Sequence, residues 1–263
     1  MSISFAVGNR RIRFAGKTDV GRVRAHNEDD FMLPEEMACC AISDGMGGHA
    51  CGEVASMIAV QTIEKYYRRT CEEETPTWPF FLPPIEVERN RMVTAIKLAN
   101  SEIYDQAAAD PNKKGMGCTV DAMYFSQGRF YIGHVGDSRG YRFRAGQLTQ
   151  LTEDHSLLND YRRVKEMSDA EIEAFPHKNV VVRALGLTEH VAVDVVVDEY
   201  ALGDIFLLCS DGLTDMLDDS VICEIIEKRQ NRLDGVCEAL IDAANEAGGK
   251  DNITAVLMHV LEA

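Results

Sequence analysis

Short apolar runs of strand length, rich in β-branched and aromatic residues, recur along this 263-residue chain and constrain its fold more than any other feature. Two pairs of runs are joined by tight connections, at Ser126-Gln127-Gly128 and around Ala145-Gly146, so each pair predicts a β-hairpin. The middle of the chain is therefore expected to be rich in strands. The predicted strands are Met37–Ser43, Thr119–Phe125, Arg129–Val135, Gly140–Arg144, Gln147–Leu151, Val191–Val197, Ile205–Ser210 and Ile253–Val260.

Apolar residues at helical spacing mark two pairs of segments, separated by this strand-rich middle. Paired helices on either side of a run of strands indicate an α+β fold rather than a regular βαβ alternation. No repeat, low-complexity tract or linker divides the sequence, so a single domain over residues 1–263 is expected. The helical positions are Val54 and Ile58; Met92, Ile96, Ala99, Ile103 and Ala107; Val221, Ile222, Ile225 and Ile226; and Val236, Leu240 and Ala243.

Two segments are expected to depart from this regular pattern. Cys71–Glu88 contains four of the seven prolines and predicts an irregular insertion loop. Leu157–Lys178 is polar and contains a capping box, Ser168-x-x-Glu171, so it predicts a small helical excursion between strands.

The formal net charge of −16 restricts the partners of the chain. Nucleic acids and anionic membrane surfaces require clustered Lys and Arg, so neither is an expected partner. The segment Met1–Arg13 lacks the apolar region of a signal peptide, and no stretch approaches the ~18 apolar residues of a membrane span. The eight cysteines form no C-x-x-C pair, so we expect buried, reduced thiols and a cytoplasmic location.

Acidic motifs follow several of the apolar runs. An aspartate beside a glycine at the end of a buried strand suits a hard cation, because the strand fixes the carboxylate and the glycine lets a backbone carbonyl approach. Several carboxylate ligands favour Mg²⁺ or Mn²⁺ over zinc or copper. The motifs are Glu28-Asp29-Asp30; Asp44-Gly45; Gly136-Asp137-Ser138-Arg139; and Asp211-Gly212 together with Asp251-Asn252.

Each motif alone has an ordinary explanation. Asp-Gly after a strand is usually a turn, and Glu28-Asp29-Asp30 alone is more often a solvated acidic turn. Gly136-Asp137-Ser138-Arg139 could be a helix cap or a turn with a surface ion pair. Their recurrence favours one shared metal site, because the strands that carry them should lie side by side. Two ions there can share a bridging carboxylate and a bridging water, which attacks a phosphate ester in line.

With these motifs in order, the sequence resembles the metal-dependent protein phosphatases, the protein phosphatase 2C family of serine/threonine phosphatases, in their compact bacterial form. The resemblance extends over nearly the whole chain and rests on eight segments: TDVGRVRAHNEDD (18–30), SDGMGGHACGEVAS (43–56), GCTV (117–120), VGDSRGYR (135–142), LTEDHS (151–156), VVRALG (181–186), LLCSDGLTDML (207–217) and GGKDNITAVL (248–257).

This resemblance implies a central sandwich of two antiparallel β-sheets flanked by pairs of helices, with the metal ions at one end. It implies an enzyme that hydrolyses phosphoserine and phosphothreonine by a metal-activated water, on phosphoproteins that a partner serine/threonine kinase modifies. Leu157–Lys178 falls where the family carries a flap near the substrate cleft, whereas Cys71–Glu88 is not a core family feature. Nothing in the sequence demands more than a monomer.

The metal-binding roles carry over residue by residue. Asp44 resembles the carboxylate that bridges two Mg²⁺ or Mn²⁺ ions, with the Gly45 carbonyl as a further ligand. Asp211 and Asp251 resemble the remaining ligands of the first ion.

Further acidic residues match the other metal positions of the family. Glu28 and Asp29 match the acidic pair that serves the second ion, directly or through water. Asp137, together with Asp211, matches the third-ion site of bacterial members.

Other residues match supporting roles. Arg24 matches the phosphate-binding arginine, whose planar fork can hold two phosphate oxygens, and Asn252 is expected to support the site. Eukaryotic members often place a general-acid histidine where this chain has Met46; His49 nearby could protonate the leaving oxygen, cap the following helix or face solvent. His155 is expected to be structural.

Two other functions fit the sequence less well. Residues 45–50 satisfy the dinucleotide-binding pattern G-x-G-x-x-A, but the following helix leads to a proline-rich loop and another helix, not to a second parallel strand. A catalytically inactive relative that serves as a binding module should have lost metal ligands, yet every acidic position that can be matched is filled. The sequence therefore predicts a working phosphatase.

Overall fold

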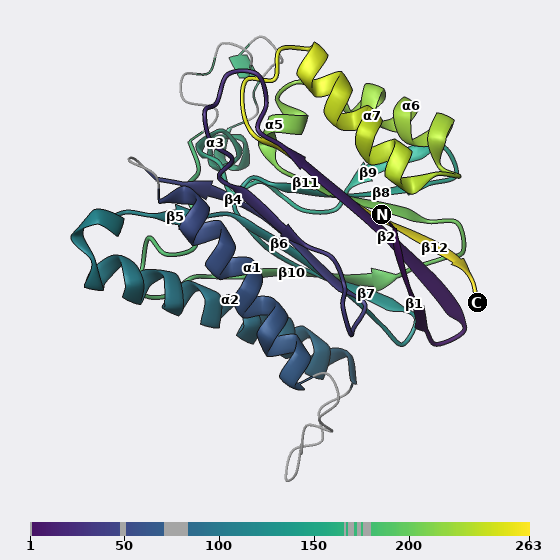
Figure 1. The fold of residues 1–263 in the computed structure, drawn as a ribbon, viewed down its shortest axis with the longest axis horizontal. Helices are drawn as coiled ribbons and strands as arrows, with labels where there is room; N and C mark the ends of the chain where they lie inside the picture. The colour runs from purple at the N-terminus through teal and green to yellow at the C-terminus, as the bar shows by residue number, and fades with distance from the viewer. Residues whose placement is uncertain are drawn as a thin grey trace.

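The computed structural model describes residues 2–47, 51–70, 84–165, 167, 171–172, 175 and 180–263. Two six-stranded antiparallel sheets face each other, and pairs of helices cover their outer faces (Figure 1). The observed architecture is therefore an α+β sandwich of four layers, as predicted.

The first sheet contains both ends of the chain. Its longest strands, β2 and β12, pair from Asp19↔Ile253 to Arg10↔Glu262, so the N- and C-terminal segments lie side by side. In spatial order the sheet consists of β1 (Ile3–Val7), β2 (Arg10–Asp19), β12 (Ile253–Glu262), β11 (Ile205–Cys209), β8 (Arg139–Arg144) and β9 (Gln147–Gln150).

The second sheet is built from the middle of the chain and is also antiparallel. Its order is β10 (Asp194–Glu199), β7 (Arg129–Val135), β6 (Val120–Ser126), β4 (Cys39–Met46) and β3 (Asp29–Met32), and the short β5 (Gly117–Cys118) pairs with the end of β4.

Three apolar cores hold the four layers together. The core between the sheets includes Ile12, Phe14, Phe125 and Phe206. Another joins the second sheet to α1 (Gly52–Thr70) and α2 (Pro84–Ala109), which the short η1 (Pro111–Lys113) follows. The last joins the first sheet to α6 (Asp219–Arg229), α7 (Leu233–Glu246) and the short α5 (Asp211–Thr214). Because the central strands β4, β6, β7 and β11 are buried on both faces, they are apolar runs with few polar interruptions.

Both hairpins and all four predicted helices are confirmed, and β10 begins three residues later than predicted. The prediction for Cys71–Glu88 is wrong at its end, because α2 begins at Pro84, where proline's fixed φ suits the first turn of a helix; residues 71–83 lie outside the described part. In Leu157–Lys178, α3 (Leu157–Val164) begins after Ser156, whose Oγ accepts from Asn159 N, whereas Ser168 of the predicted capping box lies outside the described residues.

Three N-terminal strands were not predicted. In β2 the charged Arg11 and Arg13 alternate with Ile12 and Phe14, which are fully buried. Alternation of this kind indicates a strand, but three arginines in four residues lowered the apolar content below that of the other runs.

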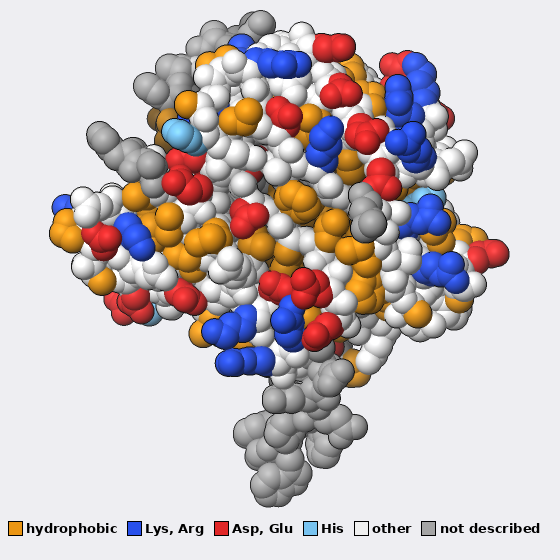
Figure 2. Space-filling model, viewed as in Figure 1, with side chains coloured by type: hydrophobic (Ala, Val, Ile, Leu, Met, Phe, Trp, Pro, Cys, Tyr) orange, Lys and Arg blue, Asp and Glu red, His pale blue; other side chains and the backbone are white. Residues whose placement is uncertain are grey.

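The surface agrees with the mixed, mainly acidic composition. On the face shown in Figure 2, Lys and Arg lie in small groups interspersed with Asp and Glu. None of the described helices combines the length and apolarity that crossing a bilayer demands.

Candidate metal centre

A pocket of about 490 Å³ opens at the end of the sandwich where β4, β7 and β11 finish and where the loops before β3 and β12 meet. This is the end that carries α3 and α5 in Figure 1. Its wall contains six carboxylates and, among the described residues that line it, a single cationic side chain. The lining residues are Arg24, Glu28, Asp44, Gly45, Met46, Gly47, Thr119, Asp137, Val181, Asp211, Asp215 and Asp251.

Strand pairing places Asp29 and Asp44 side by side. The two residues are directly opposed in the β3–β4 register. The backbone of Asp44 is fixed on its other side, because its carbonyl accepts from Thr119 N (2.8 Å) and its amide donates to Thr119 Oγ1 (3.0 Å). The position of the Asp44 carboxylate is therefore set by both neighbouring segments of the sheet.

Asp29 has one satisfied and one unsatisfied carboxylate oxygen. Its Oδ2 accepts hydrogen bonds from Ser210 Oγ (2.8 Å) and Thr254 Oγ1 (2.6 Å). Its Oδ1 is buried and has no hydrogen-bond partner. A buried oxygen without a partner is costly, so it is well suited to accept a cation.

Gly45 occupies a place where a side chain does not fit. A Cβ built on it would lie 2.2 Å from the Gly52 carbonyl oxygen and 2.6 Å from that of Glu28. Its amide donates to the Glu28 carbonyl (3.1 Å). The first turn of α1 and the loop before β3 can therefore approach the end of β4 only because residue 45 lacks a side chain.

Two more carboxylates come from the end of β11. Asp211 opens α5, and Asp215 follows one turn later, so both line the pocket from one helix face. A Cβ at Gly212 would lie 2.0 Å from the Asn252 carbonyl, so this glycine permits the close approach of the Asp251-Asn252 loop.

Asn252 holds the loop that carries Arg24 and Glu28. Its Nδ2 donates to the carbonyls of Val20 and His26 (both 2.9 Å), and its Oδ1 accepts from Glu28 N (2.8 Å). These three hydrogen bonds of the buried Asn252 side chain all go to the backbone of one loop. The contacts are consistent with the predicted supporting role of Asn252.

The carboxylates raise one another's pKa. Burial, followed by the charges of Asp29 and Asp211, raises the pKa of Asp44 well above its ordinary value. Burial and Asp137 raise the pKa of Asp211 to about 8, and burial is the main reason that the pKa values of Asp29 and Asp137 rise to about 6. Groups shifted in this way require positive charge if all are to be ionised together.

Arg24 supplies part of that charge. Its Nη2 donates to Asp251 Oδ2 at 2.6 Å, while Asp251 Oδ1 accepts from Asn252 N at 2.8 Å. The hydrogen bond that Arg24 donates to Asp251 is the main cause of its raised pKa, and the charges of Glu28 and Asp44 add to it.

The residues present fit a divalent-cation site by the chemistry of their oxygen donors and by the unsatisfied Asp29 oxygen. In the described part of the chain, no three acidic, histidine or cysteine side chains yet converge closely enough to hold an ion. Asp29 Oδ2 and both carboxylate oxygens of Asp251 instead accept hydrogen bonds within the protein.

The structure therefore gathers most of the predicted residues. Arg24, Glu28, Asp44, Gly45, Asp137, Asp211 and Asp251 line the pocket, and Asp29 lies beside Asp44. His49 lies outside the described residues. Sequence reasoning overlooked Asp215 and Thr119, although both stand within motifs that it used, and the spacing of four between Asp211 and Asp215 was available as a signal.

Comparison with known proteins identifies the family. The sequence profile of the family "Protein phosphatase 2C" matches residues 21–257. The chain is 37% identical over 250 residues to "Serine/threonine phosphatase stp" of Listeria monocytogenes serovar 1/2a, a match that covers 92% of this chain and 94% of that one. This chain belongs to the protein phosphatase 2C family.

Solved structures agree with this assignment. The crystal structure of the Mycobacterium tuberculosis serine/threonine phosphatase PstP/Ppp superposes with a TM-score of 0.82 at 32% identity, covering 96% of this chain and 99% of that one. The catalytic domain of PstP in complex with two manganese ions has a TM-score of 0.81 at 32% identity and covers 95% and 99%.

Proposed function

We propose that this chain is a divalent-metal-dependent phosphatase that hydrolyses phosphoserine and phosphothreonine in proteins, in one step and without a covalent enzyme intermediate. The observation that carries the proposal is the pocket in which carboxylates at the ends of β4, β7 and β11 and in the loop before β12 meet Arg24. The family match and the serine/threonine phosphatases among the relatives support the same activity.

The carboxylates are proposed to hold Mg²⁺ or Mn²⁺ as two core ions and a third. Asp44 would bridge the core ions, with the Gly45 carbonyl beside it, and Asp211 and Asp251 would complete the first position. When bound, such ions supply positive charge to the phosphoryl group and a nucleophilic water of lowered pKa.

The remaining acidic residues are proposed to serve the other two positions. Glu28 and Asp29 would serve the second core ion, directly or through water. Asp137 and Asp211 would hold the third.

Arg24 is proposed to bind the phosphate group. Its side chain is half exposed at the pocket and already bonds a carboxylate there, so its guanidinium is in place to bind a second anion. The Arg24 guanidinium would offset the negative charge that develops on the phosphoryl oxygens in the transition state. His49 is retained as a candidate proton donor to the leaving oxygen.

We further propose that residues 1–263 form one phosphatase domain, with an insertion between α1 and α2 and with 157–178 as a flap. Its substrates would be phosphoproteins modified by a serine/threonine kinase of the same pathway, and the domain would act as a monomer. A cytoplasmic location is proposed because six of the seven described cysteines are buried as small core residues.

The test is hydrolysis of p-nitrophenyl phosphate and of a phosphothreonine peptide in the presence of EDTA, Mg²⁺, Mn²⁺ or Zn²⁺. We expect release of phosphate with Mn²⁺ or Mg²⁺ and none with EDTA. Replacing Arg24 with alanine should raise KM and lower kcat for both substrates, while Arg24→Lys should retain part of the activity. A wild-type chain that is folded but inactive with every metal would contradict the proposal and favour a binding module.

A further inference from the structure

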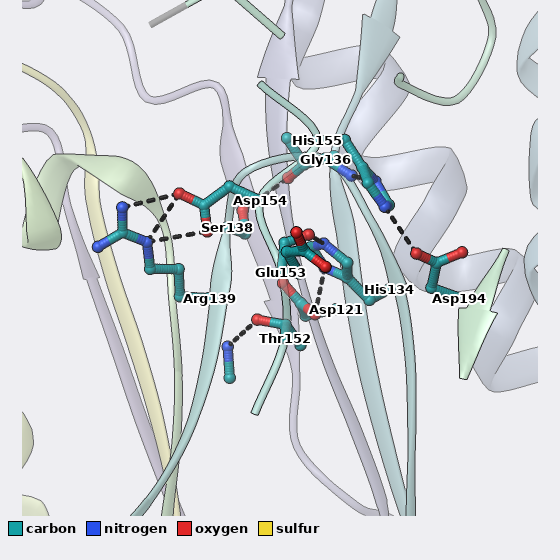
Figure 3. Close-up of polar contacts among 12 residues, drawn as sticks. Asp121, His134, Gly136, Ser138, Arg139, Thr152, Glu153, Asp154, His155 and Asp194 are labelled. Atoms are coloured by element: carbon teal, nitrogen blue, oxygen red, sulfur yellow. Dashed lines mark hydrogen bonds and ion pairs between the residues drawn. The ribbon is translucent and has the colours of Figure 1, made fainter. Parts of the chain in front are cut away.

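Behind the pocket, two histidines whose rings pack at a tilt form a buried cluster that the proposed chemistry does not use. The rings of His134, on β7, and His155, just before α3, have centroids 4.5 Å apart (Figure 3). Their side chains are 1% and 3% exposed. Neither ring lines the pocket, so their role has to be sought in what they hold.

His155 makes two hydrogen bonds to Gly136, the residue before Asp137. Its backbone amide donates to the Gly136 carbonyl (2.7 Å), and its Nδ1 accepts from the Gly136 amide (3.0 Å). Gly136 has a φ of 122°, and a Cβ there would lie 2.5 Å from Thr119 Cβ, so this strained turn depends on glycine. Without His155 Nδ1, the buried Gly136 amide would lose its acceptor.

The hydrogen bond from the Gly136 amide fixes the tautomer of His155. Because Nδ1 accepts from an amide, the ring proton is on Nε2, which donates to Asp194 Oδ2 at 3.0 Å. Asp194 in turn forms an ion pair with Arg183 (3.0 Å between Nη1 and Oδ1). Burial, together with the charges of His134 and Arg183, lowers the pKa of His155 to about 4, so the ring is neutral near pH 7.

His155 also holds the segment that forms another wall of the pocket. Its carbonyl accepts from Val182 N (2.9 Å), and the next residue, Ser156, forms an isolated bridge with Val181. Val181 lines the pocket. One residue thus contacts both the turn that presents Asp137 and the segment that returns from α3.

His134, whose ring packs against that of His155, is itself held by hydrogen bonds. His134 Nδ1 lies 2.9 Å from Asp121 Oδ1, and its Nε2 lies 3.0 Å from the Glu153 carbonyl. The His134 ring is therefore held at both nitrogens, and the His155 ring packs against it at an interplanar angle of 36° (Figure 3).

From these contacts we infer that His155 is a positioning residue for metal binding: its Nδ1 holds the Gly136 amide and so sets the orientation in which Asp137 meets a divalent cation. This inference rests on the proposed assignment of Asp137 as a ligand. Groups that orient metal ligands without touching the ion typically contribute about 10- to 100-fold to affinity or activity.

Two substitutions separate this role from simple packing. In His155→Asn, the side-chain oxygen lies near the former position of Nδ1 and can still accept from the Gly136 amide. In His155→Gln, the amide reaches the position of Nε2, so the contact with Asp194 is kept and the acceptor for Gly136 is lost. Both variants lose the imidazole ring that packs against His134. Both should therefore lower the melting temperature in EDTA by similar amounts.

The readouts are the Mn²⁺ concentration that gives half of the Mn²⁺-induced shift in melting temperature, and kcat and KM for p-nitrophenyl phosphate. We expect His155→Gln to raise that concentration about tenfold and to lower kcat with little change in KM, whereas His155→Asn stays within about threefold of wild type. Equal responses of the two variants to Mn²⁺ would overturn the inference.

Asp137→Asn serves as the reference. If it leaves the Mn²⁺ dependence unchanged, the proposed ligand assignment has failed, and with it the basis of this inference. If it weakens the Mn²⁺ dependence and His155→Gln does not, the inference about His155 alone has failed. Should His155→Gln not fold, Asp194→Ala, which removes the partner that orients the ring, must raise the half-saturating Mn²⁺ concentration, and an unchanged value would refute the inference.

Discussion

Strand β11 has an aspartate beyond each end, and the two have opposite surroundings. Asp204 precedes the strand, and its side chain is 1% exposed. Arg144 donates to both of its oxygens at 2.6 Å, and Ala201 N donates to Oδ2 at 2.7 Å. This carboxylate is fully neutralised by the protein itself.

Asp211, beyond the other end, faces carboxylates instead of a guanidinium. Asp137, Asp215, Asp251 and Asp29 all raise its pKa, in addition to burial. The same strand therefore carries one carboxylate that stabilises the fold and one that the fold alone leaves uncompensated. Residue type does not distinguish them; the charge of the neighbours does.

The largest difference between substitutions at the two ends of β11 should appear in phosphatase activity. Asp211→Asn or Asp251→Asn should lower turnover of a phosphothreonine peptide by more than about 100-fold, beyond the effect typical of residues that only orient ligands, while the circular dichroism spectrum stays native. Asp204→Asn is the matched control and should keep most of the activity. Nearly full activity in Asp211→Asn would break the comparison.

Thermal stability in the presence of metal should sharpen the comparison between Asp204 and Asp211. Because bound cations neutralise the repelling carboxylates, Mn²⁺ at about 100 times its Kd should stabilise the native state by about 2.7 kcal/mol, which corresponds to about 5–10 °C in melting temperature for a chain of this size. Differential scanning calorimetry measures this shift. Asp204→Asn should show the same gain and Asp211→Asn a smaller one; an unchanged wild-type melting temperature at millimolar Mn²⁺ would count against the account.

Without metal, substitution of Asp204 should lower the free energy of unfolding more than substitution of Asp211. Removing the charge of Asp204 leaves Arg144 without its partner, but the Arg144 side chain is 44% exposed and can be hydrated. We therefore expect Asp204→Asn to lose about 2 kcal/mol, less than a fully buried ion pair would. In EDTA, Asp211→Asn should be as stable as wild type or more so. Urea denaturation of the two variants tests this, and a larger loss in Asp211→Asn would reverse the interpretation.

The smallest expected effect is on the pH dependence of the metal-free protein. The folded-state pKa of Asp211 is raised from 3.8 to about 8, so the native state binds more protons than the unfolded state between these values. The contribution of this group is therefore fully present below pH 3.8 and is lost as the pH rises to about 8. In EDTA, the melting temperature of wild type minus that of Asp211→Asn should fall from pH 5 to pH 8; a constant or rising difference would contradict the shift.

The strands that carry the site could be predicted because burial on both faces makes them apolar runs, as in β4, β7 and β11. Their antiparallel partners could be predicted only where a short turn joined them. The pairing of β2 with β12, which connects residues more than 230 positions apart, left no local signal. Arg11 and Arg13 alternate with buried residues on β2, and the charge obscured a strand that the period of two would have indicated.

Much of the site could be predicted because its carboxylates follow apolar runs, and the order of the motifs matched a known family. The difference between Asp204 and Asp211 could not be predicted from the sequence. It depends on Arg144, which lies beside Asp204 only because β8 pairs with β11. Likewise, His155 could be predicted to be structural, but its contact with Gly136 depends on how the segment before α3 folds back against the end of β7.

The most direct test of the central claim is the number of Mn²⁺ ions bound per chain, measured by equilibrium dialysis and elemental analysis. The account predicts at least two ions on wild type, the same number on Asp204→Asn, and fewer on Asp211→Asn. Equal binding by all three proteins would show that the carboxylate beyond the end of β11 does not hold the metal.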